Sequence, residues 1–182
     1  MNIEGVENMQ FTNNDTMQKS AEQFYLPKYH EIPDVGLYLD QVTKYINEFF
    51  APFPDFTLTS SMISNYVKKG LVENPNHKQY SREQIAYLIY ITVAKSVLSL
   101  DNLILMIRLQ KASYDLKTAY DYFRLEFQNV LQYVFGLKDT LESVGVDDTE
   151  EKAMLRSTII TAAYKLHLEE FFHTVRNAEH NA

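Results

Sequence analysis

The sequence predicts a mostly α-helical protein, in which a winged helix-turn-helix precedes a C-terminal antiparallel helical region. A short amphipathic helix, a turn-forming cluster and a longer helix follow one another between Leu58 and Ile107. Apolar residues recur at helical spacing again beyond residue 112. With 182 residues, of which 46% are hydrophobic, the chain can fill a substantial core.

The residues from Thr59 to Lys69 predict a short helix with two distinct faces. Thr59 can accept hydrogen bonds from first-turn amides, and Gly70 suits the left-handed residue that ends a helix. One face is apolar, with Met62, Ile63, Tyr66 and Val67. The other is small, polar and basic, with Ser61, Ser64, Asn65 and Lys68. That face suits a helix in the major groove of DNA, although an ordinary surface helix shares the pattern.

The following residues predict a small wing and two more helices. Glu73 to Gln79 form a turn cluster of a length that joins two short antiparallel strands. Ser81 and Gln84 have capping-box spacing, so a helix should begin there. Ser99 then interrupts this helix and begins another.

This stretch resembles the MerR-type DNA-binding domain. The shared pattern lies over Tyr66, Gly70, Leu71, Tyr80, Ser81, Ser99, Leu100 and Ile104. The resemblance implies a recognition helix from Thr59 to Lys69 and a wing from Glu73 to Gln79. It implies that bases or phosphates are contacted by Ser61, Ser64 and Asn65, and that the DNA backbone is neutralised by Lys68, Lys69, Lys78 and Arg82.

The same stretch also resembles an uncharacterised bacterial family, the domain of unknown function eighteen thirty-six. Its pattern matches Leu58, Thr59, Met62, Asn65, Tyr66, Val67, Lys68, Tyr80 and Ser81. The likeness extends from about Leu26 into the C-terminal helices, and it implies a family but no function.

Three regions are expected. Residues 1–24 lack helical or strand periodicity and are predicted to be a mobile N-terminal tail. Residues 25–111 are predicted to form the winged helix-turn-helix DNA-binding domain. Residues 112–182 are predicted to form a C-terminal helical dimerisation or effector region. Asp34 should cap the first helix of the DNA-binding domain. The connection from that helix to the recognition helix is longer than in MerR domains and contains two prolines, which leaves the docking angle open.

The C-terminal region predicts two long helices. The first runs from Ser113 to Phe135 and ends at Gly136; the second is capped by Asp147, Asp148 or Thr149. The first helix is apolar over much of its circumference, which predicts a homodimer. Its rings also admit a pocket for a small-molecule effector, although such a stripe more often forms core. These rings are Tyr114, Tyr120, Tyr122, Phe123, Phe127, Tyr133 and Phe135.

Charge is unevenly distributed along the chain. The formal net charge is −7, but residues 57–111 carry seven basic and three acidic residues, against an acidic excess on both sides. Only this central third therefore suits duplex DNA. The chain has no cysteine, no signal peptide and no apolar run of membrane-spanning length, which predicts a cytoplasmic protein that does not enter a membrane.

No catalytic or cofactor motif is present. The only cluster that suggests a metal site is His167, Glu169, Glu170 and His173, and an exposed charged turn explains it better. The sequence therefore predicts a sequence-specific DNA-binding transcriptional regulator that is not an enzyme and needs no cofactor. The alternative is a protein-protein interaction module that has the winged fold but does not bind DNA.

Overall fold

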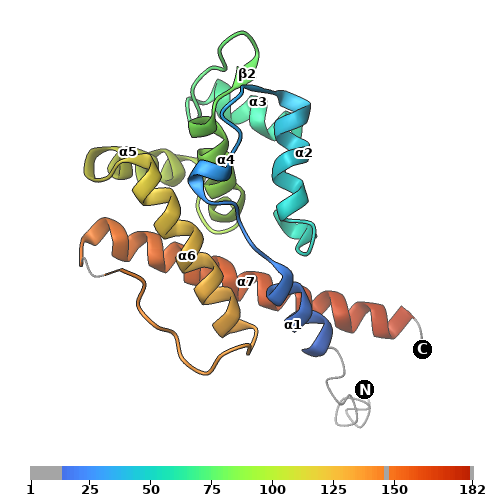
Figure 1. Cartoon of the computed structure of the whole chain (residues 1–182). Coiled ribbons are helices and arrows are strands. Elements are labelled where there is room, and N and C mark those ends of the chain that lie inside the picture. Colours follow the sequence, from blue (N-terminus) through green and yellow to red (C-terminus); the bar gives the residue numbers. More distant parts are fainter. Residues whose placement is uncertain (1–13, 146–147, 181–182) are drawn as a thin grey trace.

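The structure is a computed structural model that describes residues 14–145 and 148–180 (Figure 1). The helices are α1 (Asn14–Gln23), α2 (Leu39–Phe49), α3 (Ser60–Lys68), α4 (Arg82–Ala94), α5 (Leu100–Ser113), α6 (Leu116–Val134) and α7 (Glu150–His180), with short 3-10 turns η2 (Tyr29–Glu31) and η3 (Pro54–Phe56). Two strands, β1 (Leu37–Tyr38) and β2 (Gln79–Tyr80), pair in an antiparallel sheet. The prediction of a mostly helical fold with a small β element is confirmed.

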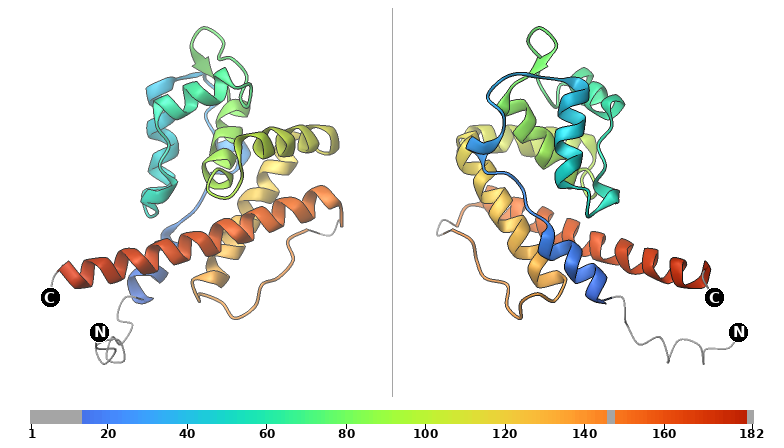
Figure 2. Two further views of the ribbon diagram at one scale, coloured as in Figure 1. Left: turned by 180° about the vertical axis from the view of Figure 1, so that it is seen from behind. Right: turned by 45° about the vertical axis from the view of Figure 1, so that its right-hand side comes forward.

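The helices form two connected parts. α2, α3, α4 and the sheet lie at one end of the molecule, and α6 and α7 cross at the other (Figures 1 and 2). α6 contacts α1, α4, α5, α7 and η2, so it lies at the centre of the fold. None of the helices within residues 14–145 and 148–180 is long and apolar enough to cross a membrane.

The predicted helix ends are confirmed where local signals define them. Thr59 Oγ1 accepts a hydrogen bond from Met62 N at 3.2 Å, and Ser81 and Gln84 form a capping box. Gly70 has φ +73°, and Leu71 N donates to Tyr66 O at 2.9 Å, as in a Schellman motif.

The N-terminal predictions need two corrections. Residues 14–23 form a helix whose Met17 and Ala21 are buried with the adjacent Phe24, so this stretch is not a mobile tail; residues 1–13 of that prediction lie outside the described residues. Asp34 does not cap α2, because residues 37 and 38 first form β1. The helix begins after Tyr38, whose N–H donates to Gln41 Oε1 at 2.9 Å.

The wing also differs from the prediction. β2 pairs with β1, which precedes α2, rather than with the residues just before the turn. Gly36 makes this pairing possible, because a Cβ there would lie 2.7 Å from Gln79 Cβ. Near the turn itself there is only an isolated bridge between Asn76 and Gln79. The wing is therefore a loop anchored on β1.

The long connection between α2 and α3 is part of the core. Its Phe53 and Phe56 are 0% and 2% exposed. The Phe56 ring lies 6.0 Å from that of Phe127 on α6, and the Phe53 ring lies 5.7 Å from that of Phe135. This connection is therefore long because it packs the N-terminal helices onto α6, and one hydrophobic core joins the regions predicted as separate domains.

α6 and α7 run in the same direction, so the predicted antiparallel pair is wrong. Lys152 Nζ, at the start of α7, lies over the ring of Tyr122 in the first half of α6 at 5.2 Å. Further along both helices, His167 in the middle of α7 packs against Phe135 at the end of α6, with ring centroids 5.1 Å apart. Residues 135–145 run back along α6 towards the start of α7 (Figure 1). Thr149 caps α7 by accepting from Lys152 N, and the alternative cap Asp147 lies outside the described residues.

Candidate functional site

α3 presents its polar face outward. Ile63 and Tyr66 are 0% and 7% exposed, whereas Ser61, Ser64 and Asn65 are all exposed. The predicted division of this helix into two faces is therefore confirmed. Ser64 Oγ donates to the Ser60 carbonyl at 2.9 Å, which holds this side chain along the helix.

Two side chains set the position of α3. Asn47 on α2 accepts from Leu58 N at 2.9 Å and donates to Leu58 O at 2.8 Å, so one amide satisfies both backbone groups of a fully buried residue. Lys95 at the end of α4 donates to Thr57 O at 2.6 Å. Burial lowers the pKa of Lys95 to about 8. The residues just before α3 are thereby attached to both α2 and α4.

Three predicted lysines are exposed at one end of the molecule. Lys68 and Lys69 lie at the C-terminal end of α3, and Lys78 lies in the loop before β2 (Figure 1). His77 and Lys78 have φ 48° and 66°, and Gln79 N donates to Asn76 O at 2.9 Å. These two positive φ values are those of a type I′ turn, so the loop has a defined conformation.

Arg82, the fourth predicted basic residue, is engaged with the N-terminal segment. Its Nε donates to Ile32 O at 2.8 Å, an Nη lies 3.5 Å from Asp34 Oδ1, and its guanidinium lies 5.8 Å from the centre of the Tyr29 ring. Arg82 therefore holds this segment against α4, and its guanidinium is less available for a partner molecule than the three exposed lysines are.

An acidic residue lies at the opposite end of α3. Ser60 Oγ, in the first turn, donates to Asp40 Oδ1 at 3.2 Å. Asp40 is exposed on α2. The positive character of this surface is consequently concentrated at the C-terminal end of α3 and on the wing, and a carboxylate lies near the other end.

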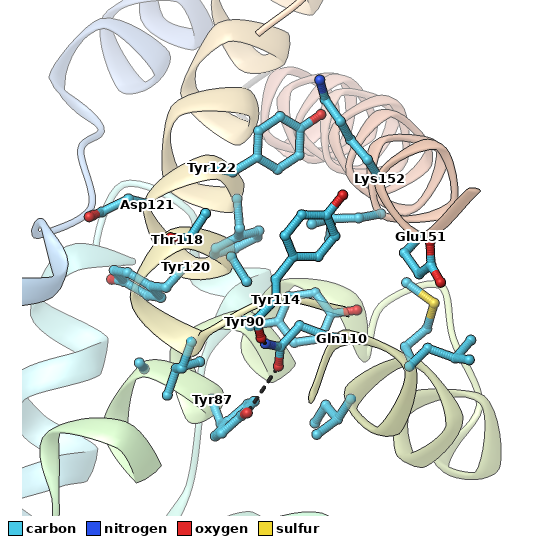
Figure 3. Close-up of a pocket in the computed structure, with 18 of the residues that line it drawn as sticks. Tyr87, Tyr90, Gln110, Tyr114, Thr118, Tyr120, Asp121, Tyr122, Glu151 and Lys152 are labelled. Carbon is cyan, nitrogen blue, oxygen red and sulfur yellow. Dashed lines mark hydrogen bonds between the residues drawn. The ribbon is translucent and has the colours of Figure 1, made fainter. Parts of the chain in front are cut away.

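A second candidate site is an apolar pocket of about 540 Å³ between α4, α5, α6 and the start of α7 (Figure 3). Four of the seven rings predicted for an effector pocket line it: Tyr114, Tyr120, Tyr122 and Phe123. Phe127 and Phe135 are in the core instead. Tyr87 and Tyr90 on α4 and Gln110 on α5 also line the pocket. The sequence did not indicate these three, because only the packing of α6 on α4 and α5 brings them to the same place.

Three polar groups of the pocket, from Tyr87, Gln110 and Tyr114, are joined by hydrogen bonds. Tyr87 Oη donates to Gln110 Oε1 at 2.9 Å, and Gln110 Nε2 donates to the Tyr114 carbonyl at 2.8 Å. Burial raises the pKa of Tyr87 to about 12 and also raises that of Tyr90. The Tyr90 hydroxyl is buried and has no hydrogen-bond partner in the part of the chain that the structure describes.

The suggested metal cluster is only partly assembled. Asp55 joins Glu169 and His173, with one possible ligand atom from each within 4.8 Å of the others. His167 packs on Phe135 instead. Burial raises the pKa of Glu170, with His173 acting in the opposite direction. Exposed acidic groups often gather in this way without an ion, so the cluster does not by itself define a metal site.

Comparison with known proteins identifies a family. No curated protein and no solved structure matches the chain. A family model described as Domain of unknown function (DUF1836) matches residues 27–123, which begin after α1 and end within α6. The match covers more than half of the 182 residues and includes both the α3 surface and all six aromatic rings that line the pocket. The chain therefore belongs to the family described as Domain of unknown function (DUF1836).

Proposed function

We propose that the protein is a non-enzymatic, sequence-specific DNA-binding transcriptional regulator that places α3 in the major groove. The observation that carries this proposal is the outer face of α3, where exposed Ser61, Ser64 and Asn65 are followed by two exposed lysines. Its inner face is buried, and Asn47 and Lys95 hold the preceding residues. A rigidly supported helix with an exposed polar and basic face suits groove binding.

The element order supports a MerR-like docking mode. β1, α2, α3, a loop, β2 and α4 follow in sequence, and the loop lies at the same end of the molecule as α3 (Figure 1). In this mode Ser61, Ser64 and Asn65 face bases or phosphates, and Lys68, Lys69 and Lys78 contact the phosphate backbone. Arg82 contributes indirectly, because its guanidinium is bound to Ile32 O and Asp34.

The second candidate is a protein-protein interaction module that does not bind DNA. Asp40 favours it, because its carboxylate lies close to the first turn of α3, where phosphates would approach a recognition helix. The overall charge of −7 acts in the same direction. A basic partner protein would be attracted to the end of α3 that repels DNA.

The proposal includes a homodimer, because one short helix with small polar side chains would discriminate weakly between sequences. The apolar residues around α6, from which a dimer was predicted, do not support a dimer, because α6 packs against α1, α4, α5, α7 and η2 of the same chain. An apolar stripe on α7 supports it instead: Tyr164, Leu168 and Phe172 are spaced by four residues and are 48%, 55% and 50% exposed. We propose that two copies pair through this stripe.

The proposal is tested by selecting bound fragments from random duplex DNA and measuring affinity for an enriched duplex at several salt concentrations. Changing Lys68→Gln and Lys78→Asn together should reduce the salt slope of log K by about 1.8, because each lost phosphate contact removes about 0.9. Asparagine tolerates the positive φ at position 78, so the wing should keep its shape.

The matched control neutralises two exposed lysines on other elements, Lys19→Gln on α1 and Lys117→Gln on α6. It removes the same net charge, so its salt slope should stay at the wild-type value. Asp40→Asn should instead strengthen binding. Failure to enrich any motif at low salt, or equal slopes in the two double variants, would overturn the proposal in favour of the interaction module.

A further inference from the structure

We infer that the pocket between α4, α5 and α6 binds an uncharged, mainly apolar small molecule that offers one hydrogen-bonding group to the Tyr90 hydroxyl. This inference goes beyond DNA binding and does not depend on it. The pocket has a volume of about 540 Å³, within the range of small-molecule sites, and apolar and aromatic side chains form most of its lining (Figure 3).

The chemical class follows from the polar groups that are already satisfied. Tyr87 binds Gln110, Gln110 binds the Tyr114 carbonyl, and Tyr120 Oη donates to Pro27 O at 3.0 Å. Glu151, on α7, accepts from Ser113 Oγ at 3.0 Å. The charged lining residues Asp121 and Lys152 are engaged as well, since Asp121 accepts from Tyr29 N at 3.1 Å and Lys152 Nζ lies over the Tyr122 ring. A ligand therefore meets mainly ring faces and aliphatic carbons, where a charged group would lose most of its hydration.

The Tyr90 hydroxyl gives the site its specificity. Its oxygen is buried without a hydrogen-bond partner among the described residues, which costs free energy in a protein without ligand. The ring is fixed edge-on against Phe123, with centroids 5.4 Å apart, so the hydroxyl cannot easily turn to solvent. This oxygen has almost no accessible surface, so a ligand with one acceptor or donor must displace neighbouring side chains slightly to reach it. It would then satisfy a group that the protein leaves unpaired.

The position of the pocket connects it to the DNA-facing part. α4 follows directly after the wing and supports α3 through Lys95, and α6 carries the opposite wall of the pocket. A bound molecule would therefore contact both parts of the fold at once. If the protein regulates transcription, such a molecule would be its effector.

The experiment uses the full chain and two fluorescent probes that share one ring skeleton. N-phenyl-1-naphthylamine is neutral and has one N–H that can donate to the Tyr90 oxygen, whereas 1-anilinonaphthalene-8-sulfonate carries an added anion. We expect saturable binding of the neutral probe at one site per chain. The sulfonate should bind at least about tenfold more weakly, because it loses its hydration among apolar side chains and the ammonium group of Lys152, in the lining, already lies over the Tyr122 ring at 5.2 Å.

Two variants test whether the probe binds in this pocket. Tyr90→Phe should weaken binding of the neutral probe by about threefold to tenfold, the value of one hydrogen bond. The same change should leave the urea midpoint of the free protein unchanged or raise it, because it removes a buried unpaired hydroxyl. Weaker binding in an equally or more stable protein cannot result from damage to the fold. Ala119→Trp should fill the cavity and abolish binding.

Tyr133→Phe is the matched control, because Tyr133 lies on α6 outside the pocket. This variant should bind the neutral probe with the affinity of the wild type. Unsaturable binding, equal affinity in Tyr90→Phe and wild type, or tighter binding of the sulfonate would overturn the inference. If Ala119→Trp does not fold, Tyr90→Phe alone decides. No DNA is present, so failure here is distinguishable from failure of the proposed function.

Discussion

The buried ion pair between α6 and α7 should respond very differently to removal of its two partners. Glu126 is 0% exposed, and Arg156 Nε lies 2.8 Å from its Oε1. Among the described residues, neither carboxylate oxygen meets hydrogen-bond geometry, so the charge of Arg156 is its main compensation. Arg156 is 29% exposed, and its Nη2 also donates to Glu142 O at 3.1 Å. Arg156 can therefore be solvated by water or bind the Glu142 carbonyl, whereas the buried Glu126 carboxylate has neither access to water nor a second partner among the described residues.

The expected magnitudes follow from this asymmetry. Arg156→Met leaves a fully buried carboxylate unpaired and should destabilise the protein by about 3–5 kcal/mol. Glu126→Leu leaves a cation that can turn towards water and should cost about 1–2 kcal/mol. The double variant removes both charges and keeps the volume, so its stability should lie within about 1 kcal/mol of the wild type or exceed it.

Urea unfolding followed by circular dichroism measures these differences as shifts of the midpoint at constant slope. The two single variants and the double variant form a cycle that isolates the coupling between the two side chains. The reasoning is refuted if Arg156→Met costs no more than Glu126→Leu. It is also refuted if the double variant is as unstable as the two single changes added together.

Three further predictions concern the α3 support and the α7 stripe. Asn47→Leu should cost about 2–4 kcal/mol in urea unfolding, because it leaves the N–H and C=O of the buried Leu58 unpaired; Asn65→Leu, on the exposed face, should change stability little. Stability should rise between about pH 8 and pH 10, because the unfolded chain keeps the Lys95 proton up to its ordinary pKa of 10.5, whereas the folded protein loses it at about 8. Lys95→Met should remove this rise, and above pH 10 the tyrosines whose pKa is raised by burial should lower stability in both proteins. Leu168→Glu should convert a dimer to a monomer of 21.3 kDa in sedimentation equilibrium; a wild type that is already monomeric would exclude the proposed α7 interface.

The sequence by itself determined those features that depend on residues three or four positions apart. The cap at Thr59, the Schellman turn at Gly70 and the capping box at Ser81 are all local hydrogen-bond patterns, and each lies where it was predicted. The two faces of α3 also follow from local spacing, because burial of one apolar stripe orients the rest of the helix. This is why the candidate DNA-facing residues could be named from the sequence.

Only the tertiary structure decided the features that depend on distant segments. Residues 14–23 carry few apolar side chains, yet they form a helix because Met17 and Ala21 are buried in the assembled core. Arg82 has a local pattern that suits phosphate binding, but Ile32 and Asp34 engage it across fifty and forty-eight residues. The direction of α7 and the pocket at Tyr90 likewise result from the packing of α6 against several helices at once. Hydrophobic burial is not directional, so an apolar stripe shows that a helix packs but does not show against which partner or in which direction.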